Sequence, residues 1–115
     1  MSPVKGFMFD LDGTLVLSDR SLGGYEVLPG AIEALSSLQE RAIPFVVLTN
    51  GSAYRPADQA SRLRSVGLPL KDEQMLTPSS VAADLMRRAG ITRALILGSR
   101  GVGEEIGRAS CRERV

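Results

Sequence analysis

Cysteine and long apolar segments are scarce in this chain of 115 residues. The one cysteine, Cys111, lies near the end, so residues 1–104 offer no disulfide, no thiol nucleophile and no thiolate ligand for a metal. No apolar run approaches the length of a membrane span, and the first residues contain no hydrophobic signal segment. We therefore expect a cytoplasmic protein with no membrane partner.

An excess of charge of either sign is also missing. The formal net charge is +1 at pH 7; three arginines and one glutamate lie beyond Glu105, and without them the charge is −1. The chain therefore has no excess of positive charge that would favour a nucleic acid as a partner. The length suits one modest domain, and no internal repeat or low-complexity segment interrupts it.

An apolar run that ends abruptly in acids is the most informative segment. Residues 4–11 predict a buried strand, because they are rich in aromatic and branched side chains. Gly13 breaks this run and leaves Asp10 and Asp12 at the carboxyl end of the strand, where open α/β sheets form their ligand crevice. Two close carboxylates repel each other, and a divalent cation relieves that repulsion. An ordinary Asp-Gly turn is the alternative, but the strand before it and Thr14 after it favour a functional site.

A second apolar run, residues 44–48, ends in Thr49, Asn50 and Gly51. A hydroxyl, an amide and a flexible glycine backbone suit a phosphate-binding turn. Asn-Gly suits a hairpin turn equally well. The acidic motif lies one strand-helix-strand unit earlier, and this pairing favours the phosphate-binding interpretation.

The two motifs together resemble those of the haloacid dehalogenase superfamily, whose members are mostly phosphotransferases on a Rossmann-like sheet. Residues 9–15, with the sequence FDLDGTL, resemble the first motif. This resemblance implies that Asp10 is a nucleophile that forms an aspartyl-phosphate and that Asp12 is the general acid and base. It also implies a Mg²⁺ cofactor held by the Asp10 side chain and the Asp12 backbone carbonyl. Dehalogenases of the superfamily lack an acid at the second position and P-type ATPases have threonine there, so Asp12 favours a phosphatase or a phosphomutase.

The resemblance extends to the second motif and to one branch of the superfamily. It implies that Thr49 hydrogen-bonds the transferring phosphoryl group, with Asn50 and Gly51 completing the phosphate-binding turn. Residues 28–35 and 76–83 resemble the class IIA branch, which includes nucleotide, phosphoglycolate and pyridoxal phosphate phosphatases. This branch inserts a cap domain after the second motif and acts on small phosphorylated metabolites. The branch favours hydrolysis over a phosphomutase, and the intact Asp12 argues against a binding module without catalysis.

The later motifs of the superfamily, a lysine and then a Gly-Asp segment, have no counterpart here. Lys71 precedes the expected cap strand and is better interpreted as a solvated loop residue. Beyond Asp84 the acids are Glu104, Glu105 and Glu113, with no Asp pair. We therefore expect the 115-residue chain to have little or no activity, because stabilising the phosphoryl charge is a large share of this catalysis.

The last residues, 105–115, resemble the translation of a sequencing adapter, and we expect them not to belong to the natural protein. A genuine basic tail is the alternative. Gly101 and Gly103 do not make a dinucleotide fingerprint, because its third glycine would fall at Ile106.

The alternation of strands and helices predicts an α/β fold, namely a partial Rossmann-like parallel sheet with flanking helices, truncated at the start of the cap domain. We expect residues 1–78 to be the first part of the catalytic core, residues 79–104 to begin the cap, and residues 105–115 to be the non-native tail. Because such a sheet leaves apolar faces uncovered, we expect the chain alone to be poorly soluble or partly folded.

The individual elements follow from periodicity and from breaker residues. Strands are predicted at residues 5–11, 45–48, 75–77 and 94–98, helices at residues 31–41 and 56–66, and a loop at residues 16–28, where the family has a flap. A third helix is predicted to begin at a cap on Ser79 or Ser80 and to end at Gly90. The residues predicted to face the core are Ile32, Leu35, Leu38, Ala42, Ala57, Ala60, Leu63, Val66, Val81, Leu85, Met86 and Ala89. The arginines at 55, 62 and 64 are interpreted as a solvated helix face rather than a phosphate-attracting patch.

Overall fold

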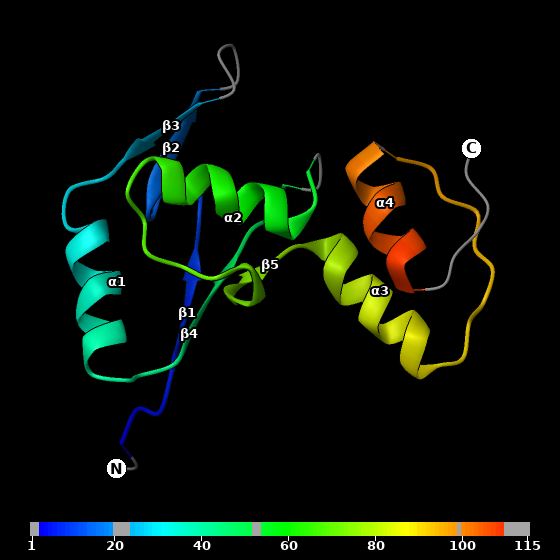
Figure 1. Cartoon of the computed structure of the whole chain (residues 1–115), viewed down its shortest axis with the longest axis horizontal. Coiled ribbons are helices and arrows are strands. Elements are labelled where there is room, and N and C mark those ends of the chain that lie inside the picture. The colour runs from blue at the N-terminus through cyan, green and yellow to red at the C-terminus, as the bar shows by residue number, and fades with distance from the viewer. Residues whose placement is uncertain (1–2, 20–23, 52–53, 99, 110–115) are drawn as a thin grey trace.

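The computed structural model describes residues 3–19, 24–51, 54–98 and 100–109 (Figure 1). In chain order the elements are β1 (Phe7–Asp10), β2 (Val16–Asp19), β3 (Gly24–Val27), α1 (Ala31–Glu40), β4 (Phe45–Leu48), α2 (Pro56–Ser65), a short 3-10 helix η1 (Asp72–Gln74), β5 (Met75–Leu76), α3 (Pro78–Arg88) and α4 (Arg100–Ala109). No helix in these ranges is long and apolar enough to cross a membrane.

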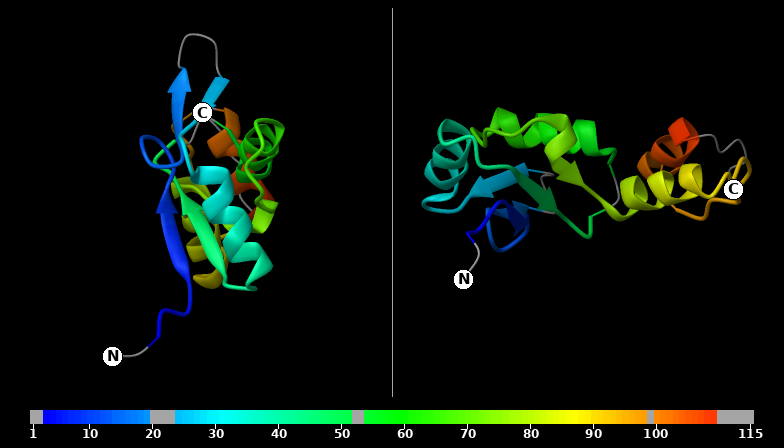
Figure 2. Two further views of the ribbon diagram at one scale, coloured as in Figure 1. Left: turned by 90° about the vertical axis from the view of Figure 1, so that its left-hand side faces the viewer. Right: turned by 90° about the horizontal axis from the view of Figure 1, so that it is seen from below.

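A three-stranded parallel sheet, in the order β1-β4-β5, forms the centre of the fold. Asp10 lies opposite Leu48, and Leu48 lies opposite Leu76, so the carboxyl ends of the strands share one edge. Both crossovers advance in the same direction across the sheet, and right-handed connections then place both helices on one face. Figure 2 shows α1 and α2 together on one side of the strands. The predicted α/β class and parallel sheet are confirmed.

The main core lies between the sheet and these two helices. It contains Leu11, Leu15, Val16, Ala31, Leu35, Leu38, Phe45, Val47, Ala60, Leu63, Leu68, Leu70 and Met75. The predicted inward positions Leu35, Leu38, Ala60 and Leu63 are buried, whereas Ala42 is exposed because it lies beyond the end of α1. Burial of each such leucine contributes about 1.5–3 kcal/mol. The core therefore fixes the strand ends against α2.

The first strand is shorter and more exposed than predicted. It spans Phe7–Asp10, and the side chains of Phe7 and Met8 are 42% and 67% exposed. The prediction of a buried strand was wrong because β1 is an edge strand among the described residues and both neighbouring helices lie on the same face. Leu11, directly after β1, is fully buried.

The segment predicted as a loop, residues 16–28, contains a hairpin instead. Strands β2 and β3 pair antiparallel, with Val16 opposite Val27 and Ser18 opposite Tyr25. Branched and aromatic residues form short alternating strands here, and this signal was overlooked because of the glycines at 23 and 24. Residues 20–23 lie outside the described residues.

The start of α3 also differs from the prediction. Thr77, rather than Ser79 or Ser80, is the N-cap: Thr77 Oγ1 accepts a hydrogen bond from the Ser80 amide at 3.2 Å, and Ser80 Oγ accepts one from the Thr77 amide at 2.9 Å. Pro78 occupies the first helical position, which moves the cap to the residue before it.

The inward face of α3 was also predicted incorrectly at three positions. Val81, Leu85 and Ala89 are exposed, and Ala83 is the buried apolar residue of this helix. The reason is that α3 packs beside α4 rather than against the sheet, so a different stripe of the helix is covered.

Residues 94–98 form no strand. Figure 1 shows α3 and α4 side by side, and Ile96 packs with Ala83 and Ile106 in a second, small apolar cluster there. The helix α4 was missed because its glycines lower helix propensity. It includes residues 105–109, while residues 110–115 with Cys111 lie outside the described residues. That residues 105–115 are not native stays a prediction.

Candidate active site

A tight turn after β1 positions the two acids of the first motif. The carbonyl of buried Leu11 accepts hydrogen bonds from the amides of Leu15 at 2.9 Å and Val16 at 3.2 Å. Gly13 has φ 83°, a left-handed conformation that favours glycine, and its amide donates to the Val16 carbonyl at 2.7 Å. Leu11 thus anchors the turn in the core, and Asp10 and Asp12, on either side of it, line the cavity.

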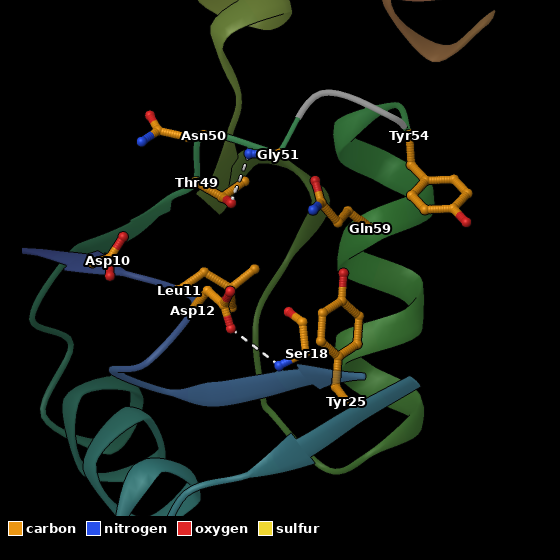
Figure 3. A pocket seen from close by; sticks show the side chains of 10 residues that line it. All are labelled: Asp10, Leu11, Asp12, Ser18, Tyr25, Thr49, Asn50, Gly51, Tyr54 and Gln59. Carbon is orange, nitrogen blue, oxygen red and sulfur yellow. Dashed lines mark hydrogen bonds between the residues drawn. The ribbon is translucent and has the colours of Figure 1, made fainter. Parts of the chain in front are cut away.

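Each carboxylate is oriented by one hydrogen bond from a nearby donor. The Thr14 hydroxyl donates to Asp10 Oδ2 at 3.3 Å. The Ser18 amide in β2 donates to Asp12 Oδ1 at 3.0 Å, as Figure 3 shows. Thr14 and the hairpin therefore each provide a donor to one of the acids, and the hairpin has a direct contact with the site.

The second motif follows the neighbouring strand. Thr49 is 7% exposed, and its amide donates to the Leu76 carbonyl of β5 at 3.1 Å. Its Oγ1 accepts a hydrogen bond from the Gly51 amide at 3.1 Å (Figure 3). This bond uses a lone pair of the hydroxyl oxygen and not the hydroxyl hydrogen. The hydrogen can therefore be donated to a ligand oxygen. Asn50 and Gly51 are exposed and complete the turn.

A cavity of about 590 Å³ brings both motifs together at the carboxyl ends of β1 and β4. It is lined by Asp10, Leu11, Asp12, Ser18, Tyr25, Thr49, Asn50, Gly51, Tyr54 and Gln59 (Figure 3). All five predicted site residues are among them, so the structure groups the residues that the two motifs suggested. Their catalytic and phosphate-binding roles stay predictions.

Four polar or aromatic residues of the cavity were missed from the sequence. Ser18 and Tyr25 belong to the hairpin that was predicted as a loop, and Tyr54 precedes α2. Gln59 could have been identified from the sequence, because it is a polar residue on the inward stripe of α2. Its neighbours on that stripe, Ala60 and Leu63, are apolar.

The arginines of the α2 region bind other parts of the protein rather than the cavity. Arg55 forms an ion pair with Asp58 at 2.9 Å, and this hydrogen bond lowers the pKa of the Asp58 carboxyl and raises that of the guanidinium. Both side chains are partly exposed to solvent, which limits what the pair contributes to stability. Arg64 pairs with Asp72 at 2.8 Å.

The third arginine of this region, Arg62, has aromatic partners. It lies over the Tyr54 ring at 4.5 Å and over the Tyr25 ring at 5.6 Å, which joins the hairpin to α2. All three side chains therefore have partners within the protein, and none of them lines the cavity.

The oxygen atoms at the site provide some, but not all, of the ligands that a hard divalent cation needs. Asp10, which brings a carboxylate, and Asp12, which brings a backbone carbonyl, both line the cavity, and Mg²⁺ commonly uses one or two carboxylates while keeping several waters. Among the described residues there is no group of three acidic, histidine or cysteine side chains that could hold a metal. Within the described ranges, the two aspartates are thus the acidic residues at the cavity that could hold the ion.

Known proteins resemble this chain in sequence and in fold. The family profile described as haloacid dehalogenase-like hydrolase matches residues 7–111. The 5'-nucleotidase YutF of Bacillus subtilis is 29% identical over 92% of the chain and 40% of its own length, and the ribonucleotide monophosphatase NagD of Escherichia coli is 27% identical over the same shares.

The solved structures give the same result. The 4-nitrophenylphosphatase of Thermotoga maritima superimposes with a TM-score of 0.81 at 27% identity, over 96% of this chain and 40% of that one. The chain therefore spans about 40% of the length of these relatives. On the match of profile, sequence and fold, the chain belongs to the haloacid dehalogenase-like hydrolases, in their class IIA phosphatase branch.

Proposed function

We propose that this chain is the first part of a longer, magnesium-dependent phosphatase that hydrolyses small phosphomonoesters through an aspartyl-phosphate. The observation that carries the proposal is the convergence of Asp10, Asp12 and Thr49 on one cavity at the strand ends. Proteins similar to this chain include a nucleotidase, a dihydroxyacetone phosphatase and acid sugar phosphatases, which supports a phosphorylated metabolite as the substrate.

In the proposed first step, a carboxylate oxygen of Asp10 attacks phosphorus and the bond from phosphorus to the leaving oxygen breaks. Asp12, oriented by the Ser18 amide, gives its proton to that leaving oxygen. Thr49 donates its hydroxyl hydrogen to a phosphoryl oxygen, which favours the in-line arrangement. The products of this step are an alcohol and an aspartyl-phosphate on Asp10.

In the second step, Asp12 takes a proton from a water molecule and the water oxygen attacks phosphorus. The bond from phosphorus to Asp10 breaks, so inorganic phosphate leaves and both aspartates return to their starting states. Bound Mg²⁺, which the Asp10 carboxylate and the Asp12 backbone carbonyl would hold, would supply positive charge that offsets the repulsion between the Asp10 carboxylate and the phosphoryl group.

We also propose that the 115-residue chain has little activity by itself. Among the described residues no lysine or arginine lines the cavity, so this part of the chain offers no cationic side chain to the phosphoryl group. The separate apolar cluster of α3 and α4 supports a division near residue 78, with the cap beginning after it. Robust Mg²⁺-dependent hydrolysis of p-nitrophenyl phosphate by the chain alone would contradict this proposal.

Trapping of the covalent intermediate tests the main proposal. The full-length protein, incubated briefly with phosphate-labelled substrate and quenched in acid, should retain label on the peptide that contains Asp10. Asp10→Asn should carry no label, whereas Glu33→Gln, which changes an exposed acid on α1, should label like the wild type. Substrate turnover without any labelled protein would argue against the aspartyl-phosphate, and binding of phosphate without turnover would favour a binding module.

The same experiment separates a hydrolase from a phosphomutase. A hydrolase releases the label as inorganic phosphate, because water accepts the phosphoryl group. A phosphomutase would instead return the label to a second hydroxyl of the substrate. Release of inorganic phosphate in step with substrate loss is the outcome we expect.

A further inference from the structure

The turn of the second motif contains two neighbouring residues that can react with each other. Asn50 is the only asparagine in the sequence, and Gly51 follows it directly. Both residues are exposed. In Figure 3 the Asn50 side chain points away from Thr49 and Gly51, and no hydrogen bond joins it to the other residues drawn. The side-chain amide of Asn50 is therefore accessible to water and to the backbone that follows it.

Asparagine is a thermolabile residue, because the backbone nitrogen of the next residue can attack its side-chain amide. Here the Gly51 nitrogen would form a bond to the side-chain carbonyl carbon of Asn50. The bond from that carbon to its amide nitrogen would break, and this nitrogen would leave as ammonia with the proton of the Gly51 amide. Water then opens the five-membered succinimide ring at either of its two carbonyls. The product is aspartate or isoaspartate, in which the backbone runs through the side chain.

The local structure favours this ring closure. Glycine has no Cβ that would hinder the approach of its nitrogen, and it adopts strained backbone conformations more readily than other residues. The Gly51 amide donates to the Thr49 hydroxyl at 3.1 Å. This bond can break without disturbing the sheet, because β4 ends at Leu48.

The similar pair in the first motif, Asp12 and Gly13, is held more firmly. The Gly13 amide donates to the Val16 carbonyl at 2.7 Å, and Asp12 Oδ1 accepts from the Ser18 amide at 3.0 Å. Hydrogen bonds to β2 thus engage both groups that would have to react. A carboxylate is also a weaker electrophile than a neutral amide. Asn50 is therefore the more reactive position of the two.

We propose that Asn50 is a site of spontaneous deamidation, which replaces the neutral amide in the phosphate-binding turn with a carboxylate and inactivates the enzyme. Asp10 and Asp12 already line the cavity, and among the described residues no cationic side chain does. A further carboxylate beside Thr49 would repel the phosphoryl group without a counter-charge. The modification itself goes beyond the proposed phosphatase function, whereas the loss of turnover rests on it.

Ageing of the full-length protein tests the proposal. The protein is held in warm, mildly alkaline buffer, sampled over time and digested with trypsin. Trypsin does not cut before Pro56, so Asn50 lies in the peptide of residues 42–62, which contains no other asparagine. This peptide should be converted into two heavier products, one of which is a substrate of protein isoaspartyl methyltransferase. Hydrolysis of p-nitrophenyl phosphate should fall in proportion to the modified fraction.

Gly51→Ala should slow the modification. An added Cβ would lie 3.4 Å from Thr49 Oγ1 and 3.5 Å from Gln59 Nε2, which are ordinary contacts, so the turn can accept alanine. The loss of backbone freedom should lower the rate by about threefold or more. Turnover, relative to its starting value, should decline more slowly by the same factor. Gly24→Ala is the matched control, because Gly24 is an exposed glycine with open space around it that does not follow an asparagine. It should leave the rate of modification unchanged.

Asn50→Asp places the carboxylate in the turn without ageing and tests its consequence directly. The additional negative charge close to the phosphoryl group should lower kcat/KM for p-nitrophenyl phosphate by about tenfold or more. If Gly51→Ala does not fold, this variant and the wild-type time course decide the proposal.

The outcomes separate this inference from the proposed function. If the peptide of residues 42–62 keeps its mass, Asn50 is not a modification site and the inference is overturned. It is also overturned if the peptide is modified while turnover stays at its starting value, or if Asn50→Asp has the kcat/KM of the wild type. If fresh wild-type protein hydrolyses no phosphomonoester in Mg²⁺, the phosphatase proposal fails, and the mass of the peptide still decides whether Asn50 deamidates.

Discussion

The unit formed by residues 3–77 and the pair of helices α3 and α4 differ in how their apolar residues are covered. In the described residues the first unit buries thirteen apolar side chains in one continuous cluster, whereas the helix pair buries three. The larger core can hold side chains at fixed positions, and the candidate site lies at its edge. The smaller cluster supports packing of two helices but lines none of the site.

The first unit alone positions the residues of the candidate site. The cavity residues lie between Asp10 and Gln59, so one unit of the chain builds this part of the site. The helix pair is joined to that unit by the Thr77 cap and by an ion pair between Arg55 and Glu104 at 3.4 Å. Changes at the site or in the core of the first unit should therefore affect catalysis or global stability, and changes in the helix pair or at the surface should have smaller and more local effects.

The largest effect is expected at Asp12. Asp12→Asn keeps the size of the side chain and can still accept the Ser18 hydrogen bond, but it cannot transfer a proton. We expect turnover in the full-length protein to fall by about 10²–10⁴-fold with the melting temperature nearly unchanged. Steady-state kinetics with p-nitrophenyl phosphate and circular dichroism measure the two quantities. A variant with near wild-type turnover would exclude Asp12 as the proton shuttle.

The next effect compares the two apolar clusters directly. Leu35→Ala removes a fully buried side chain from the large core and should lower the free energy of unfolding by about 2–5 kcal/mol. Ile96→Ala in the small cluster should cost less, because the cluster lies between two helices that can close over the gap. Urea denaturation of the full-length variants gives the free energies, and hydrogen exchange of α1 and α3 locates the loss. Equal losses would contradict the division into a strong and a weak region.

The predictability of the fold follows the same division. Three elements of the first unit could be predicted, because the apolar pattern and a breaker residue agree there. They are the strand Phe45–Leu48, the α1 stripe with Leu35 and Leu38, and the end of α2 at Gly67. The strand at 94–98 and the inward face of α3 could not. Periodicity identifies an apolar stripe but does not show whether a sheet or another helix covers it.

The predictability of the site has a different limit. Asp10, Asp12 and Thr49 could be found because each follows an apolar run at a strand end. Ser18 and Tyr25 depend on a hairpin whose register brings them to the cavity, and no local pattern gives that register. Gln59 was visible in the sequence as a polar residue on an apolar stripe, but its surroundings are set by the Thr49 turn on another element.

A smaller effect is expected at the junction of the two regions. Thr77→Ala removes the hydroxyl that accepts from the Ser80 amide, so α3 should lose about 0.5–2 kcal/mol of stability. Thr77→Ser keeps the hydroxyl and is the control. Hydrogen exchange in the first turn of α3 should increase in Thr77→Ala, while exchange in α1 stays unchanged. Faster exchange throughout both regions would show that the junction supports the whole fold rather than α3 alone.

The smallest effect lies within the first unit, where the hairpin meets α2. Arg62→Met removes the guanidinium from the faces of Tyr25 and Tyr54, contacts of a kind that contribute about 0.5–1 kcal/mol each at exposed sites. Hydrogen exchange of β3 should therefore rise by about 2–10-fold, because this contact holds the hairpin against α2. Arg64→Met is the control, since Arg64 pairs with Asp72 and touches neither ring. If both variants loosen β3 equally, general loss of α2 charge explains the result. If Arg62→Met alone does so, the hairpin that orients Asp12 through Ser18 is held in place by the Arg62 contact.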